Sequence, residues 1–159
     1  MATVAKPRLT AEGNGFKIGL ITAVVLILYT ASAAILGFLY RIEAGTLDVL
    51  ILVAGSVFAI KRMKDAWGNE LTYFQGFGTG IITALVASVL LGAFFWALGG
   101  IFPDAVQRLE SRDLFGTDLG ILISGLGIIL LGTMTGVITS LIAMQYFKSE
   151  DQETLTSIE

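Results

Sequence analysis

The chain contains no cysteine and no histidine, and only 14% of its 159 residues are charged. Without cysteine there can be no disulfide bridge and no thiolate nucleophile or metal ligand, and without histidine there is no imidazole ligand. The side chain best suited to proton transfer near neutral pH is also missing. These absences exclude several common kinds of catalytic and metal site, so we expect no cofactor and no enzymatic activity.

The shortage of charge also excludes an ordinary water-soluble domain, in which about a quarter of the residues are charged. Hydrophobic residues make up 55% of the chain, and the mean hydropathy is +0.82. The net charge of −3 comes mostly from the ends and loops. No basic patch of the kind that binds nucleic acid is present. We therefore expect the chain to lie in a lipid bilayer and not to bind nucleic acid.

What the chain does have is a series of long apolar runs. A helical run of about 20 residues spans the hydrocarbon core of a bilayer, which is about 30 Å thick. Four such helices and their loops use up the length, so the sequence predicts a single membrane domain, an all-α bundle of four transmembrane helices. These helices are expected at about 18–40, 46–65, 72–98 and 119–147, with polar tails at 1–14 and 148–159. The acidic second tail is expected to be disordered on its own.

The second helix is the shortest of the four runs, because only Val49 to Ile60 is free of charge. Lys61, Arg62 and Lys64 can lengthen it if their stems lie in the membrane and their charges reach the headgroups. The indole ring of Trp67 is also suited to the membrane–water interface. A half-inserted helix is the alternative interpretation.

The distribution of lysine and arginine predicts the orientation of the bundle. Seven of the ten lie in the N-terminal segment, the middle loop and the C-terminal tail, so both termini are predicted to be cytoplasmic. The third loop is then external, and Val106 and Leu109 after Pro103 predict a short amphipathic segment there. A solvated loop is the alternative. The seven cations are Lys6, Arg8, Lys17, Lys61, Arg62, Lys64 and Lys148.

The sharpest feature is a small-residue stripe in the third apolar run, formed by Gly76, Gly80, Ala84, Ser88 and Gly92 at every fourth position. Small residues let helix backbones approach closely, and close packing drives helix association in lipid. A spacing of four drifts by about 40° at each step around a helix of 3.6 residues per turn. We therefore predict that the stripe meets different neighbours at its two ends, either both in this chain or one in another subunit.

The fourth run adds a second pair of small residues at a spacing of four, Gly132 and Gly136. It also contains Thr133, Thr135 and Thr139, whose hydroxyls are expected to bond to their own helix backbone, as most such hydroxyls do. A polar path lined by these threonines is the alternative.

Charge inside the membrane usually marks transport, proton relay or catalysis. The candidates here, Asp48 and Asp118, are expected at helix ends. Paired carboxylates, a serine-based triad and a phosphate-binding loop are all missing from the sequence, which agrees with a non-enzymatic role.

The stretch from Phe58 to Gly80 resembles the Bacteroidota family catalogued as domain of unknown function 4199. That family has a short second helix running into a basic segment, a turn with glycine, and a Phe-x-Gln-Ala/Gly-Phe-x-x-Gly entry to the third helix. Phe102-Pro103-Asp104 is similar to its third loop, whereas Gly78 and Gly68-Asn69 depart from its pattern. The resemblance extends over about 16–147 and implies a four-helix inner-membrane protein of uncharacterised role. The matching residues are Lys61, Arg62, Lys64, Asp65, Gly68, Tyr73, Phe74, Gln75, Gly76, Phe77 and Gly80.

The sequence thus favours a structural or accessory membrane subunit that acts through helix packing, in a homo-oligomer or in a larger inner-membrane complex. A small transporter or channel with a path lined by threonine and glycine is the alternative. The sites of the accessory subunit would be of two kinds. The small-residue stripe with Gly132 and Gly136 would serve helix packing, and Lys61, Arg62, Lys64 and Trp67 would serve topology and headgroup contact.

Overall fold

The computed structural model describes residues 9–37, 42–101 and 117–156, and four long helices account for most of them. In chain order they are α1 (Ala11–Leu36), α2 (Ile42–Trp67), α3 (Tyr73–Ile101) and α5 (Thr117–Thr156). A short 3-10 helix, η1 (Gly68–Glu70), joins α2 to α3. The all-α prediction is confirmed for this part of the chain. The expected amphipathic segment of the third loop falls at 102–116, outside the described residues.

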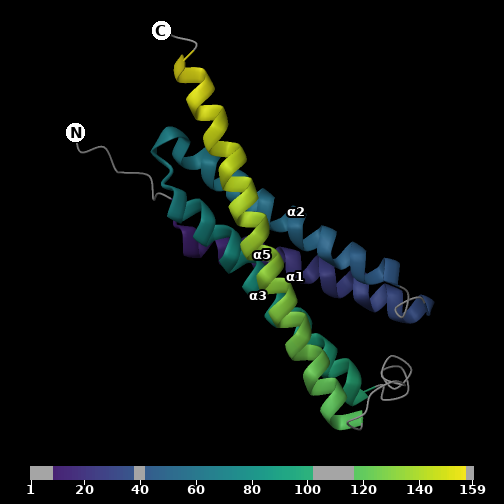
Figure 1. Ribbon diagram of the computed structural model, residues 1–159. Coiled ribbons are helices and arrows are strands. Elements are labelled where there is room, and N and C mark those ends of the chain that lie inside the picture. Colours follow the sequence, from purple (N-terminus) through teal and green to yellow (C-terminus); the bar gives the residue numbers. More distant parts are fainter. Residues whose placement is uncertain (1–8, 38–41, 102–116, 157–159) are drawn as a thin grey trace.

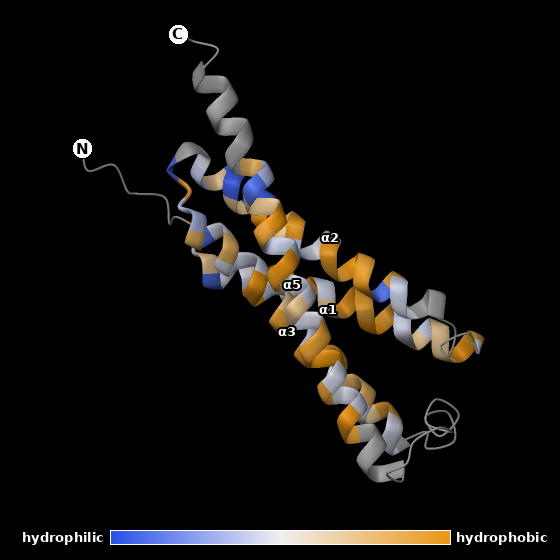
Figure 2. Cartoon of the chain, in the orientation of Figure 1, coloured by the Kyte–Doolittle hydropathy of each residue, from blue (hydrophilic) through white to orange (hydrophobic). Residues whose placement is uncertain are grey.

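Three of the helices are long and apolar enough to cross a membrane: α1, α3 over Tyr73–Gly100, and α5 over Leu122–Phe147. α2 has the same 26-residue length as α1 but contains more charge. Figure 2 shows hydrophilic residues gathered at the end of the bundle near the termini, with a hydrophobic stretch beyond them. The fold therefore has the composition of an integral membrane protein.

The helix ends differ from the predicted ones, most of all in α1. This helix begins seven residues before the expected Ile18, because Thr10 caps it: the Thr10 hydroxyl accepts a hydrogen bond from Gly13 N at 3.2 Å. It ends at Leu36, where Gly37 adopts a left-handed conformation (φ 74°) that suits glycine. α2 begins four residues before the expected start, which places Asp48 in its second turn.

α5 continues as a helix for nine residues beyond the expected end at Phe147. The prediction that the acidic tail is disordered is therefore wrong for 148–156. Extending an existing helix avoids the cost of nucleation, and Lys, Glu and Gln are good helix formers. At 1.5 Å per residue the 40 residues of α5 are about 60 Å long. Figure 1 shows its C-terminal end projecting beyond the rest of the bundle.

α3 is the central helix, since it packs against α1, α2 and α5. α2 also contacts α1 and α5. The four helices lie close together near the termini and then separate into two pairs, α1 with α2 and α3 with α5, which diverge toward the other end (Figure 1). The opening between the pairs is the setting of the candidate site described below.

α1 and α3 run parallel and almost touch through their backbones. A Cβ atom added at Gly15 would lie 2.9 Å from the backbone carbonyl oxygen of Thr79, and one added at Gly19 would lie 3.0 Å from that of Thr83. The Thr83 hydroxyl also donates to the carbonyl of Gly15 at 3.2 Å. The side chains of Ile82 and Val86 are equally close, but their movement alone would not relieve the contact, because a backbone carbonyl takes part in it at each glycine.

We expect Gly15→Ala to destabilise the protein, although alanine is the better helix former by about 1 kcal/mol. The methyl group would have to displace a neighbouring backbone, which costs about 1–3 kcal/mol and outweighs that gain. Thermal unfolding in detergent measures the difference. The control is Gly127→Ala in α5, where a Cβ meets nothing within 4 Å; it should leave the melting temperature unchanged or raise it. Equal effects of the two substitutions would contradict the close α1–α3 contact.

Candidate functional site

The small-residue stripe of α3 faces α5, which runs antiparallel to it. A Cβ atom added at Gly80 or at Gly136 would collide with the opposite helix, at Ser140 and Ala84 respectively. The neighbouring pairs are Gly76 with Met144, Gly80 with Ser140, Ala84 with Gly136, Ser88 with Gly132, and Gly92 with Ile129.

The prediction that the stripe meets different neighbours at its two ends is wrong, because α5 lies against it from Gly76 to Gly92. α5 carries its own row at the same four-residue spacing, which includes Gly132 and Gly136. Such rows are inclined to the helix axis by about 26°, so two of them follow one another when the helices cross at about 50°. The row on α5 thus follows the drift along the stripe, and Ile60 of α2 is a further neighbour at Gly80.

The sizes of the paired residues vary along the stripe. Small residues face small residues in the middle, as at Ala84 and Gly136. Larger side chains lie over glycines toward the ends: Met144 lies over Gly76, and Trp96 lies over Gly125. The neighbour of the stripe is therefore supplied within the chain.

Of the four residues predicted to contact headgroups, two form hydrogen bonds to other parts of the chain. Lys64 donates from Nζ to the carbonyl oxygen of Phe147 at 2.9 Å and lies 5.3 Å from the centroid of that ring. Trp67 donates from Nε1 to the carbonyl of Leu9 at 2.8 Å. Lys61 is exposed and Arg62 is half-buried. Two of the four thus tie the end of α2 to α5 and to the N-terminal end of α1.

Most hydroxyl groups bond to their own helix, as predicted. Thr133 and Thr135 donate to carbonyls four residues earlier, at 2.7 and 2.8 Å. Asn14, a buried amide residue that the sequence predicts in the N-terminal tail, bonds to another helix. Its Nδ2 donates across to the carbonyl of Ala59 in α2 at 2.9 Å. The missed signal was its position on one face with Ile18 and Thr22.

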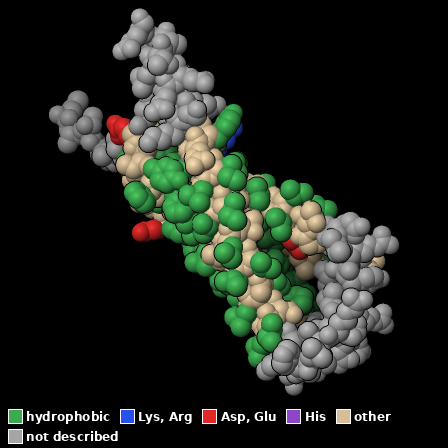
Figure 3. Space-filling view, in the orientation of Figure 1, with side chains coloured by type: hydrophobic (Ala, Val, Ile, Leu, Met, Phe, Trp, Pro, Cys, Tyr) green, Lys and Arg blue, Asp and Glu red, His purple; other side chains and the backbone are tan. Residues whose placement is uncertain are grey.

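A cavity of about 370 Å³ lies where the two helix pairs separate. The volume falls within the range of about 300–1,000 Å³ that is usual for small-molecule sites. Figure 3 shows the hollow between the pairs, walled by hydrophobic side chains. All four helices contribute to its lining: Leu26 and Thr30 from α1, Gly45, Asp48, Val49 and Leu52 from α2, Ser88, Leu91 and Phe95 from α3, and Ile128, Leu131, Gly132 and Thr135 from α5.

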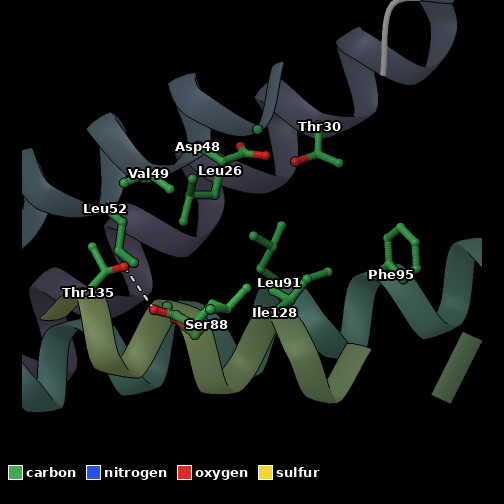
Figure 4. A pocket seen from close by; sticks show the side chains of 13 residues that line it. Leu26, Thr30, Asp48, Val49, Leu52, Ser88, Leu91, Phe95, Ile128 and Thr135 are labelled. Atoms are coloured by element: carbon green, nitrogen blue, oxygen red, sulfur yellow. Dashed lines mark hydrogen bonds between the residues drawn. The ribbon is translucent and has the colours of Figure 1, made fainter. Parts of the chain in front are cut away.

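Two oxygen atoms distinguish one wall of this cavity. Figure 4 shows the Asp48 carboxylate and the Thr30 hydroxyl pointing toward each other at the α1–α2 side. Thr30 is 5% exposed and Asp48 is half-buried, yet neither Thr30 Oγ1 nor Asp48 Oδ1 has a hydrogen-bond partner among the described residues. Leaving a buried polar atom unsatisfied costs about 1–3 kcal/mol.

The floor of the cavity is closed by Leu52, Ser88 and Gly132. A Cβ on Gly132 would collide with Ser88 and come within 3.4 Å of a Leu52 methyl group. Beyond this layer, toward the termini, Ser56 and Ala84 are completely buried. Side chains therefore close the cavity on the side of the termini.

The expectation that Asp48 lies at a helix end is wrong, because α2 begins at Ile42 and carries it inward. Asp48, Leu52, Gly55 and Ala59 follow the spacing of a single helix face, and this pattern could have revealed the position from the sequence. Side-chain contacts of Asp118 lie outside the described residues.

The described part of the chain holds no cluster of three or more His, Cys, Asp or Glu that could bind a metal ion. One carboxylate beside hydroxyls in apolar surroundings is an arrangement that suits the binding of a small molecule.

Comparison with known proteins gives one match. No curated protein and no solved structure matches the chain significantly. The model of a family described as "Protein of unknown function (DUF4199)" matches residues 15–113. The matched range covers α1, α2 and α3, including the cavity residues that they supply, and stops before α5, whereas the resemblance described above extends to 147. The chain thus belongs to the DUF4199 family of proteins of unknown function.

Proposed function

We propose that the protein crosses the inner membrane of a bacterium four times, with both termini in the cytoplasm. α1 and α3 can each span a membrane, and they run parallel. α2, which connects them, must therefore return the chain across the bilayer despite its charges. The clustering of seven of the ten lysines and arginines toward the side of the termini supports the cytoplasmic assignment.

We propose that this protein is a non-enzymatic accessory subunit of a membrane complex. The observation that carries the proposal is the length of α5. Its roughly 60 Å exceed the full bilayer thickness of about 40–45 Å, so its last turns stand in the cytoplasm. The residues there include Glu150, Asp151 and Glu153, which suit a partner with a basic surface. The small-residue stripe supports such a role less directly, because its neighbour is α5.

The test compares the full chain with a chain that ends at Ser149, both purified from native membranes. We expect a partner to co-purify with the full chain and to fall to background with the shortened one. The melting temperature should be unchanged, because the bond from Lys64 to the Phe147 carbonyl is kept. A triple variant, Glu150→Gln, Asp151→Asn and Glu153→Gln, separates charge from length. A strict monomer with no partner would contradict the subunit proposal.

A small transporter or channel is the second proposal, and the cavity is the observation in its favour. A path along Thr133 and Thr135 has less support, because α5's own backbone accepts their hydrogen bonds. Because Ser88 and Gly132 close the floor of the cavity, a substrate could cross the protein only in a second conformation in which this floor is open. A ligand for the cavity is the first requirement of this proposal.

A further inference from the structure

The cavity between the helix pairs joins two features that point to a ligand. Its walls are largely hydrocarbon, from Leu26, Leu52, Leu91 and Ile128 with the ring of Phe95. Its polar wall holds the Asp48 carboxylate beside the Thr30 hydroxyl (Figure 4). Thr30 is nearly fully buried, and its Oγ1 has no hydrogen-bond partner among the residues that the structure describes.

We propose that this cavity binds an organic ammonium cation, with the charged nitrogen at Asp48 and Thr30 and the apolar part against Leu91 and Phe95. A carboxylate and a hydroxyl oxygen both accept hydrogen bonds from an ammonium group. The contact to Asp48 is then charge-assisted, and such bonds are the strong ones. The apolar wall accounts for the remainder of the ligand.

The donor set argues against an inorganic cation. Calcium takes six to eight oxygen ligands, and magnesium requires near-octahedral oxygen coordination. The cavity offers one carboxylate, and its other hydroxyls are dispersed: Thr135 already donates to Leu131 O, and Ser88 lies at the floor. An ammonium ion needs fewer protein oxygens because its attached carbon chain is stabilised by the apolar wall.

The same chemistry can come from two sources, a free amine or the ammonium headgroup of a lipid such as phosphatidylethanolamine. A free-amine arm uses fluorine NMR of a fluorinated benzylammonium with the full chain in maltoside micelles, against the fluorinated benzyl alcohol as neutral isostere. A lipid arm uses native mass spectrometry to compare retained phosphatidylethanolamine with phosphatidylglycerol. Binding in either arm, reduced by loss of Asp48, supports the proposal and identifies the source.

Asp48→Asn should weaken binding about tenfold or more, since it removes the charge of the strongest hydrogen bond. Thr30→Val keeps the shape, removes one hydroxyl and should weaken binding by about three- to tenfold. The matched control is Asp65→Asn, an exposed carboxylate at the other end of α2, which should bind as the unmodified protein does. Melting temperatures verify that each variant is folded, and Thr30→Val serves as the test if Asp48→Asn is not.

Equal binding of the cation and its neutral isostere, or binding that both variants leave unchanged, would overturn the proposal. So would the absence of binding in both arms. None of these results bears on the accessory-subunit role, which rests on α5 beyond Phe147 and is tested by co-purification.

Discussion

Gly80→Leu is expected to lower the free energy of unfolding by about 3 kcal/mol, as strong overpacking of a close contact does. A Cβ at this position would collide with Ser140 of α5 and lie 2.8 Å from Ile60 Cδ1 of α2. Leucine adds three further carbons to this point, where three helices meet. Either α5 or α2 must move away from α3, and the paired rows on α3 and α5 would then separate.

The matched control lies two residues away on the same helix. At Gly78 a Cβ meets nothing within 4 Å, so Gly78→Leu should leave the melting temperature unchanged or raise it through better helix propensity. Thermal or denaturant unfolding in the same detergent compares the two variants. If Gly80→Leu and Gly78→Leu melt together with the unmodified protein, the stripe cannot face α5.

Asp48→Leu is expected to have the opposite sign and to raise the free energy of unfolding by about 1–3 kcal/mol. The substitution removes a half-buried carboxylate whose Oδ1 has no partner among the described residues, and leucine adds apolar area to an apolar cavity. Thr30, which keeps its hydroxyl, can rotate and bond to its own helix backbone. The measurement is again unfolding in detergent.

The control for Asp48→Leu is Asp65→Leu, which changes an exposed carboxylate on the same helix and should stay within about 0.5 kcal/mol. A lower melting temperature for Asp48→Leu would show that the carboxylate stabilises the fold. A higher one, together with lost ammonium binding, would show that the chain retains a residue that costs stability, as binding and catalytic sites often do.

The helices themselves were predictable, because long apolar runs in a chain with little charge have few alternatives. Their ends were less so. Lys17 and Asn14 look like a polar lead-in, yet Asn14 is buried and bonded to Ala59 O in another helix. A polar residue at a helix end gives the same local sequence pattern whether it contacts water or a carbonyl group of a neighbouring helix. The sequence alone therefore does not distinguish an exposed residue from a buried one.

The candidate site was missed for a related reason. The sequence predicts Asp48 at a helix end, whereas α2 begins six residues before it at Ile42. The cavity itself depends on the angle between two helix pairs, which is set by contacts such as Ala84 with Gly136. The small-residue stripe is visible in the sequence. The spacing alone does not show that the row on α5 packs against the stripe along its length.

The central position of α3 has a consequence for biosynthesis. In the proposed four-helix topology, α1 and α2 enter the membrane first, and the face of α1 with Gly15 and Gly19 then has only lipid beside it. The native neighbour of that face is α3, so the first hairpin cannot complete its packing until synthesis has passed Ile101. We infer that α1 and α2 complete their packing only when α3 has entered the membrane beside them.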